Sequence, residues 1–252
     1  MILYQRAGLS GIELWRGISR GATLFQLRDD KPRYFSALRE FLVQLHIGEA
    51  RSEDELVGAK GFSHLVLCGG EARHPALERA MVADGLPFSV CIDASGAYAA
   101  RQGALRIFRA MGWEHGVALD LGQLHLKVMT ADRNVILARQ EERLPFGAYA
   151  IDAESGQAEM RNMIRDGLAS IPCPDGVVLG LPVAIDAGGV AAPATYPRLF
   201  GPVEPIFAEL FNCPWVVMND AVLAAVGFEP EEPGKTLIVT LGFGIGGALW
   251  EK

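Results

Sequence analysis

The stretch GVALDLGQLHLK at 116–127 combines an acidic residue, a glycine and a lysine in a spacing that suits work on phosphate groups. Its apolar run predicts a strand that ends at Asp120, Gly122 allows a sharp turn, and Lys127 lies on the strand that returns. A carboxylate at such a turn can hold a hydrated Mg²⁺, as phosphoryl transfer requires. Asp120 is therefore a candidate metal-binding residue.

The stretch VVMNDAVLAAVGF at 216–228 places two polar residues where a strand gives way to a helix. The apolar run ends at Asn219 and Asp220, and a helix of small residues begins there. A carboxylate in this position could accept a proton from a substrate hydroxyl. The alternative that the sequence leaves open is an Asn-Asp pair that only caps the helix.

The stretch TLGFGIGG at 240–247 ends an apolar run with four glycines in six residues. A dinucleotide-binding loop opens a long helix, but only Ala248–Lys252 follow here. A P-loop that includes Gly234 needs a glycine at position 229, which is a glutamate. A hairpin remains, with two interpretations: a nest of backbone N–H groups for phosphate oxygens, or an ordinary turn in which glycine supplies positive φ.

Apolar periodicity places these stretches on alternating strands and helices. Helical spacing predicts helices at 35–45, 97–112, 151–171 and 203–210, and short apolar runs predict strands at 64–70, 88–93, 116–121, 176–183, 215–220 and 236–241. This alternation predicts an α/β fold of two lobes, joined near 112–116 and again near 229–235.

Composition excludes several classes of protein. The net charge of −7 and pI near 5.3 argue against a nucleic-acid partner, because phosphate backbones require clustered Lys and Arg. No apolar stretch reaches the length of a membrane span, and the first residues lack the apolar core of a signal peptide. The cysteines are scattered without metal-ligand spacing, which predicts reduced core residues, no zinc site and a cytoplasmic location.

Together these stretches resemble the ROK (repressor, ORF, kinase) branch of the actin, sugar kinase and heat-shock ATPase superfamily. ALDLGQLHLK is similar to its first phosphate motif, TLGFGIGGAL to its second, and VVMNDAVLAAVG to its N-D-A segment. LGLPVAIDAGG resembles its glycine–proline stretch on the sugar side. The resemblance implies two RNase H-like lobes, the actin-like ATPase fold, and an ATP-dependent kinase for a sugar or small polyol.

The order of the motifs differs from that of the family. HLVLCGGEARHPALERAM resembles the adenosine motif, which in the family follows the second phosphate motif but here precedes the first. The chain is therefore predicted to be circularly permuted. Its nucleotide-side lobe would comprise 1–112 plus 235–252, and the lobe with the first phosphate motif and the catalytic residues would comprise 113–234.

The resemblance also implies residue roles. Asp220 would be the general base and Asn219 would hold the sugar. Asp120 would position Mg²⁺ through water, with Gly122 and Lys127 completing the first loop. Backbone glycines would contact the nucleotide: Gly242, Gly244 and Gly246 at the phosphates, and Gly69 and Gly70 at the adenosine. The expected cofactors are ATP and Mg²⁺.

Three departures from the family's loops keep alternatives open. Gln123 and Leu124 replace a glycine and a threonine, and Phe243 replaces a threonine or serine, so hydroxyl donors to phosphate are lost. A non-catalytic ligand-binding or regulatory protein on the same scaffold is the main alternative to a kinase, and a nucleotide-hydrolysing partner of another enzyme is the third. A homodimer that exchanges lobes also stays open.

Overall fold

The computed structural model describes residues 1–12, 14, 24, 27–49, 58–82, 85–122, 125–132, 134–138, 153–169, 171, 173–191, 199, 201–242 and 244–252. The chain divides into two compact units: unit 1 comprises Met1–Gln5 and Ala100–Gly227, and unit 2 comprises Arg6–Ala99 and Phe228–Lys252. Each contains a multi-stranded sheet with helices, so the predicted α/β class is confirmed. The lobe boundaries drawn from the sequence, the RNase H-like architecture and the permutation stay predictions.

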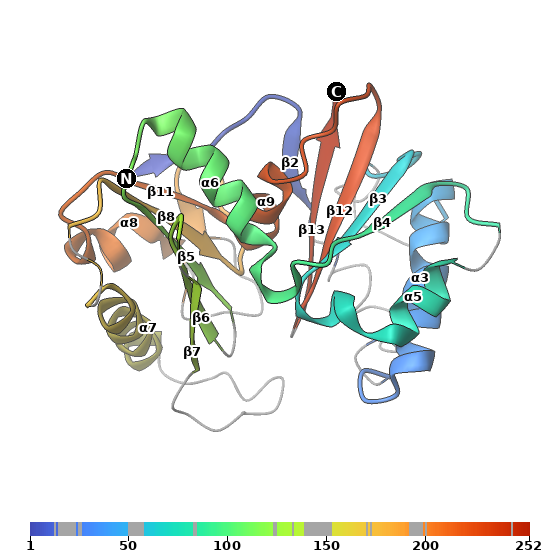
Figure 1. The fold of residues 1–252 in the computed structure, drawn as a ribbon, viewed down its shortest axis with the longest axis horizontal. Coiled ribbons are helices and arrows are strands. Elements are labelled where there is room, and N and C mark those ends of the chain that lie inside the picture. The colour runs from blue at the N-terminus through green and yellow to red at the C-terminus, as the bar shows by residue number, and fades with distance from the viewer. Residues whose placement is uncertain are drawn as a thin grey trace. The chain divides into compact units, whose positions relative to one another are not determined.

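The described strands of unit 1 form a six-stranded sheet in the order β1–β11–β8–β5–β6–β7 (Figure 1). Strands β1, β11, β8 and β5 run parallel, whereas β6 is antiparallel to β5 and β7 to β6. Parallel strands bring their carboxyl ends to one edge, where open α/β sheets bind ligands. The strands are β1 Ile2–Leu3, β5 Gly116–Leu121, β6 His125–Met129, β7 Asn134–Ala138, β8 Gly176–Leu181 and β11 Trp215–Asn219, and a separate pair joins β9 Val190–Ala191 to β10 Gly201–Pro202.

Helices cover both faces of this sheet (Figure 1). On one face, α6 (Ala100–Met111) and α9 (Asp220–Val226) contact each other and the central strands. On the other, α7 (Ala153–Leu168) contacts β6, α8 (Val203–Phe207) and the 3₁₀-helix Ala208–Leu210. The central strands are thus buried on both sides.

The alternation of side chains along β5 determines on which face of the unit 1 sheet Asp120 lies. Leu119 and Leu121 belong to the apolar cluster that includes Ile164 of α7 and Phe207 of α8. Because successive side chains of a strand point to opposite faces, Asp120 faces α6 and α9 instead. A charged residue thus lies on a helix-covered face of a central strand, where it is buried.

Two glycines allow α9 to lie close to α6 and to the sheet. A Cβ atom on Gly103 of α6 would lie 1.8 Å from the Leu223 carbonyl oxygen of α9. A Cβ atom on Gly180 of β8 would lie 3.0 Å from Leu223 Cδ2 and 3.6 Å from the Cα of Asp220. The start of α9 can therefore lie close to β8 because Gly180 has no side chain. A larger residue at this position would crowd Leu223.

The described strands of unit 2 form a five-stranded sheet in the order β2–β13–β12–β3–β4. Strands β12, β3 and β4 run parallel, and β13 is antiparallel to both β12 and β2. Strands β12 and β13 form the hairpin predicted from the glycine-rich stretch. The strands are β2 Leu9–Ile12, β3 His64–Cys68, β4 Ser89–Ile92, β12 Lys235–Leu241 and β13 Ile245–Glu251.

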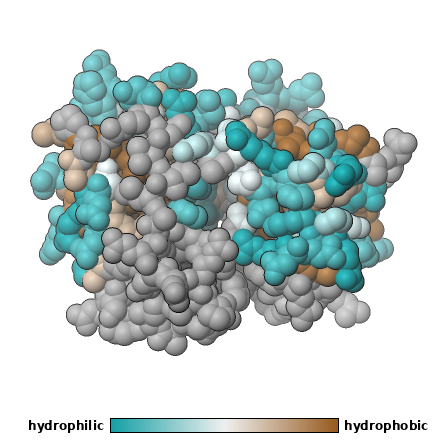
Figure 2. Space-filling view, turned by 60° about the horizontal axis from the view of Figure 1, so that its bottom comes forward, coloured by the Kyte–Doolittle hydropathy of each residue, from teal (hydrophilic) through white to brown (hydrophobic). Residues whose placement is uncertain are grey.

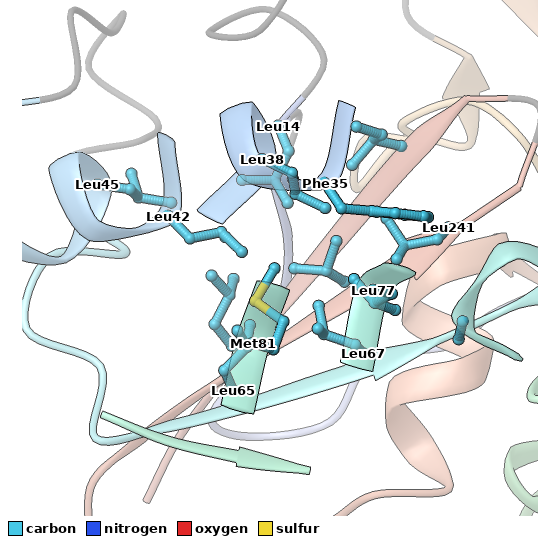
Figure 3. Packing of buried hydrophobic residues seen from close by; sticks show 14 of the residues in the cluster. Leu14, Phe35, Leu38, Leu42, Leu45, Leu65, Leu67, Leu77, Met81 and Leu241 are labelled. Carbon is cyan, nitrogen blue, oxygen red and sulfur yellow. The ribbon is translucent and has the colours of Figure 1, made fainter. Parts of the chain in front are cut away.

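Helices α3 (Lys31–Ile47) and α5 (Pro75–Val82) enclose the core of unit 2. Figure 3 shows side chains of α3 and α5 converging on those of β3 and β12, with Leu42 and Met81 among the helical residues and Leu67 and Leu241 among those of the strands. The apolar periodicity predicted α3, whose first turn is capped by Asp30 and whose end is marked by Gly48 in the left-handed conformation.

The described surface carries few large apolar side chains. Those that are exposed lie on five different elements: Ile2, Ile47, Val82, Met111 and Val190. On the face shown in Figure 2 the coloured surface is mainly hydrophilic, with brown atoms in small patches. Within the described residues, no helix has the length and apolar composition needed to cross a bilayer.

Candidate functional site

Three predicted site residues of unit 1, Asp120, Asn219 and Asp220, lie at the carboxyl ends of parallel strands. Asp120 of β5 is in register with Gly180 of β8, which is in register with Met218 of β11. Asn219 ends β11, and Asp220 begins α9. Two stretches a hundred residues apart in the sequence are therefore brought to one edge of the sheet because β5 and β11 both neighbour β8.

Asp120 forms a short ion pair with Lys127. The two residues are direct partners in the antiparallel register of β5 and β6, and Lys127 Nζ lies 2.6 Å from Asp120 Oδ2. The Asp120 side chain is 6% exposed and that of Lys127 is 24% exposed. A carboxylate buried to this extent requires a charged or hydrogen-bonding partner, and Lys127 provides one from the neighbouring strand.

The side chain of Asn219 is committed to backbone groups on both sides. Its Oδ1 accepts hydrogen bonds from the N–H groups of Ala221 (2.9 Å) and Val222 (3.3 Å). Its Nδ2 donates to the carbonyl oxygens of Leu181 (3.4 Å) and Val183 (3.1 Å). Asn219 is thus the N-cap of α9 and also ties that helix to the chain leaving β8. The capping interpretation of the Asn-Asp pair holds for Asn219.

Asp220 lies near the Asp120–Lys127 ion pair. Its Cα is close to Gly180 of β8, and Gly180 is the register partner of Asp120 in the sheet. The residue is half-buried. Burial of the carboxyl group and, second, the nearby Asp120 carboxylate together raise its pKa from 3.8 to about 7, against Lys127 and backbone hydrogen bonds, which lower it. The Ala221 N–H donates one of these bonds to Oδ1, at 2.7 Å. A carboxyl group with such a pKa can exchange a proton near neutral pH.

The raised pKa of Asp220 predicts a pH-dependent stability. The folded state holds the proton of Asp220 up to about pH 7, whereas the unfolded chain releases it near pH 4, so this group removes stability as pH rises between these values. Asp220→Asn should therefore increase the free energy of unfolding at pH 8 by about 2 kcal/mol, allowing for the partial exposure of the residue, and by almost nothing at pH 4. Urea titrations at both pH values measure this difference.

Asp166→Asn is the matched control for that experiment, because Asp166 lies exposed on α7. The control should leave the free energy of unfolding within about 0.5 kcal/mol of the wild type at both pH values. Equal effects of the two substitutions at pH 8 would show that Asp220 is not destabilised by its surroundings.

The first predicted phosphate loop is described only at its ends. Gly122 follows β5, and its N–H donates to the carbonyl oxygen of His125 at 2.9 Å, which closes the turn into β6. Gln123 and Leu124 lie outside the described residues. Gly122 and Lys127 therefore belong to one β-hairpin, in which the register of β5 and β6 places Lys127 opposite Asp120.

Apart from Gly122, the predicted nucleotide-binding glycines lie in unit 2. Gly69 and Gly70 follow β3, where Gly69 has φ of 98° and its position leaves no room for a Cβ atom, which would lie 2.5 Å from the Leu241 carbonyl oxygen. Gly70 begins the 3₁₀-helix Gly70–Arg73 and has open space around it. These two glycines therefore lie at the carboxyl ends of the parallel strands β3 and β12.

The second predicted phosphate loop is the tip of the β12–β13 hairpin. Leu241 pairs with Ile245, and the Gly242 N–H donates to the Gly244 carbonyl oxygen at 3.0 Å. Gly246 is a strand residue paired with Thr240. Phe243 lies outside the described residues. A guanidinium group also reaches this tip, since Arg28 Nη2 donates to the Gly242 carbonyl oxygen at 3.3 Å.

The donor set around Asp120 does not fit a magnesium ion held by the protein. Mg²⁺ is bound by carboxylate and water oxygens, but Asp120 Oδ2 already accepts a bond from the Lys127 ammonium group. In the part of the chain that the structure describes, no three His, Cys, Asp or Glu side chains lie together as metal ligands. The predicted role of Asp120 in positioning Mg²⁺ through water stays a prediction.

Sequence reasoning missed three contributors to this edge: Gly180 and the carbonyl groups of Leu181 and Val183. Gly180 had a signal, because a glycine inside an apolar strand often marks a close approach of another backbone. No sequence signal identified the two carbonyl groups. Their hydrogen-bond partner, Asn219, lies far along the chain and meets them only because of the order of the strands in the sheet.

The fold and site thus define a two-unit α/β protein with a carboxylate–lysine cluster at a sheet edge. No family model and no curated protein matches the chain. Among solved structures, it is similar to an inorganic polyphosphate/ATP-glucomannokinase from Arthrobacter sp. strain KM, with 20% identity and a TM-score of 0.41 over 54% of this chain and 58% of that one. The match thus spans less than two thirds of that enzyme's length. A likeness of this extent assigns neither family nor activity, so function is argued from the site.

Proposed function

We propose that this protein is an ATP-dependent kinase that transfers the γ-phosphate to a hydroxyl group of a sugar or small polyol. The observation that carries the proposal is Asp220, a carboxyl group with a pKa of about 7 at the carboxyl edge of a parallel sheet. A general base works best when its pKa is near the operating pH. Its place at this edge is where ligands of open α/β sheets bind.

In this proposal Asp220 accepts the proton of the acceptor hydroxyl as the oxygen attacks the γ-phosphorus atom. Asn219 has a positioning role in place of the sugar-binding role implied by the family resemblance, because its amide group is bonded to backbone atoms of α9 and of the segment after β8. It holds the first turn of α9, and therefore Asp220, against the sheet. The Lys127–Asp120 ion pair supplies the charges that act on the carboxyl group of Asp220.

The proposed phosphoryl donor is ATP carrying Mg²⁺ on its own phosphates. Its proposed contacts are backbone groups at the carboxyl edge of the unit 2 sheet, with Gly69 and Gly70 toward the adenosine and the Gly242–Gly246 segment toward the phosphates. Glycines suit this role because backbone can approach a ligand closely where no Cβ atom intervenes. Around Gly70 and Gly242 the structure has such open space.

A second candidate is a non-catalytic protein that binds the same ligands. The Gly242 N–H, which a phosphate nest would need, is bonded to Gly244 within the hairpin. The sequence also lacks the hydroxyl donors of the family at Leu124 and Phe243. Loss of one such donor lowers a rate by about a hundredfold or more, which favours binding without turnover.

The deciding experiment incubates the purified protein with Mg·ATP and separate pools of hexoses, pentoses and polyols, and follows phosphate monoesters by ³¹P NMR. A monoester that forms only with one acceptor pool supports the kinase. Calorimetric binding of ATP or an acceptor, with no monoester after prolonged incubation, supports the second candidate. Absence of both binding and turnover across the pools would contradict both.

A further inference from the structure

In the described part of unit 1, the carboxyl edge of the sheet brings together the carboxyl groups of Asp120 and Asp220 and the ammonium group of Lys127. Asp120 is buried and paired with Lys127 at 2.6 Å. Asp220 lies near enough to both for their charges to act on it in opposite directions. In phosphoryl-transfer sites, a pair of carboxylates is the arrangement that a divalent cation usually neutralises.

The position of Lys127 is set by the backbone and not by chance packing of a surface side chain. Asp120 and Lys127 face each other in the register of β5 and β6, which is fixed by four consecutive residue pairs. Leu126 and Val128, on either side of Lys127, are buried in the apolar core of the opposite face. Shifting the register by one residue would expose that core, so the ammonium group is held at Asp120 by the fold itself.

We propose that Lys127 is the resident cation of this edge: its ammonium group takes the place beside Asp120 that a divalent metal ion would otherwise have. Ligand binding at this edge then needs no metal ion held by the protein, and any divalent ion arrives on the ligand. The inference goes beyond the proposed kinase activity, because it concerns unit 1 alone and requires neither ATP nor an acceptor.

Removing the ammonium group should convert the edge into a divalent-cation site. Lys127→Met keeps an unbranched side chain of similar length but leaves the Asp120 carboxylate without its partner. Without the ammonium group, the Asp120 carboxylate and the carboxyl group of Asp220 at the same sheet edge can share one divalent ion. Carboxylate oxygens are the ligands that such ions prefer.

The test titrates Mn²⁺ alone into each protein and follows the free ion by electron paramagnetic resonance. Wild type and Lys127→Arg should leave Mn²⁺ free, whereas Lys127→Met should bind one ion at least tenfold more tightly than the wild-type limit. Lys127→Met combined with Asp120→Asn should lose that binding. Lys127→Gln repeats the test with a polar side chain, and circular dichroism verifies that each variant is folded.

Two outcomes would overturn the inference. One is stoichiometric Mn²⁺ binding by the wild type that Asp120→Asn abolishes, because the ion and Lys127 would then share the carboxylate. The other is folded Lys127→Met and Lys127→Gln proteins that bind Mn²⁺ no better than the wild type. Since no nucleotide is present, either result is independent of whether the protein is a kinase.

Discussion

Asp220→Asn should lower kcat for phosphoryl transfer to the acceptor by about 10²- to 10⁴-fold, the range by which a positioned general base accelerates a reaction. Asparagine keeps the size of the side chain and can still accept a hydrogen bond from the Ala221 N–H, which lies 2.7 Å from Asp220 Oδ1. It cannot accept a proton. The loss should therefore appear in kcat, with the acceptor KM changed little.

The pH profile separates a proton-accepting role of Asp220 from a structural one. Because the ionised carboxylate is the active form, kcat/KM of the wild type should rise with pH and level off above about 7, the pKa of Asp220. The residual activity of Asp220→Asn should lack this rise. Initial rates between pH 5 and 9 at subsaturating acceptor measure both profiles.

Asp166→Asn provides the control, because it makes the same chemical change on the exposed side of α7. Its kcat and pH profile should match those of the wild type. A wild-type-like kcat for Asp220→Asn, with the rise near pH 7 retained, would show that another group takes the proton. The base would then have to be sought outside α9.

The sequence was sufficient to predict which segments contribute to the candidate site. Asp120, Asn219 and Asp220 each follow an apolar run, and polar residues at the ends of buried parallel strands gather at one edge of the sheet. The same local reasoning predicted the helix that became α6 and its end at Gly112, which adopts the left-handed conformation that favours glycine. These features can be predicted from the sequence because they depend on residues that are close together along the chain.

The contacts that give these residues their properties could not be predicted locally. Whether Lys127 faces Asp120 depends on the register of β5 and β6, and a change of one residue in the turn would place Lys127 on the other face. The family resemblance implied a place for Lys127 in the first phosphate loop, which stays a prediction. The bonds from Asn219 to Leu181 and Val183 depend on β8 lying beside β11, which strand order decides.

The grouping of α6 with unit 1 was also beyond the sequence pattern. The lobe bounds implied by the resemblance, 1–112 plus 235–252, stay a prediction; in the structure α6 contacts α9, β5 and β8 and lies in unit 1. Periodicity revealed the apolar face of α6 but not the surface that it covers. Gly103 is the residue that makes this packing close, and nothing near it in the sequence identifies Leu223 as its partner.

Gly103→Ala should destabilise the protein by at least about 3 kcal/mol, the upper part of the range for overpacked cores. The new Cβ atom would lie 1.8 Å from the Leu223 carbonyl oxygen and 3.3 Å from the Gly227 N atom. Both partners are backbone atoms, so no side-chain rotation relieves the contact. The helices α6 and α9 must move apart, and the first residue of α9 is Asp220.

Helix propensity alone predicts the opposite change in the free energy of unfolding, so the experiment distinguishes the two effects. In an unobstructed helix interior, glycine to alanine stabilises by about 0.5–1 kcal/mol. Ala110→Gly, at an exposed position of the same helix, should destabilise by only about 1 kcal/mol and reports the propensity of α6 itself. Urea unfolding followed by circular dichroism measures both variants. If Gly103→Ala were as stable as the wild type or more so, α6 could not pack on α9 as described, and the position of Asp220 against the sheet would lose its support.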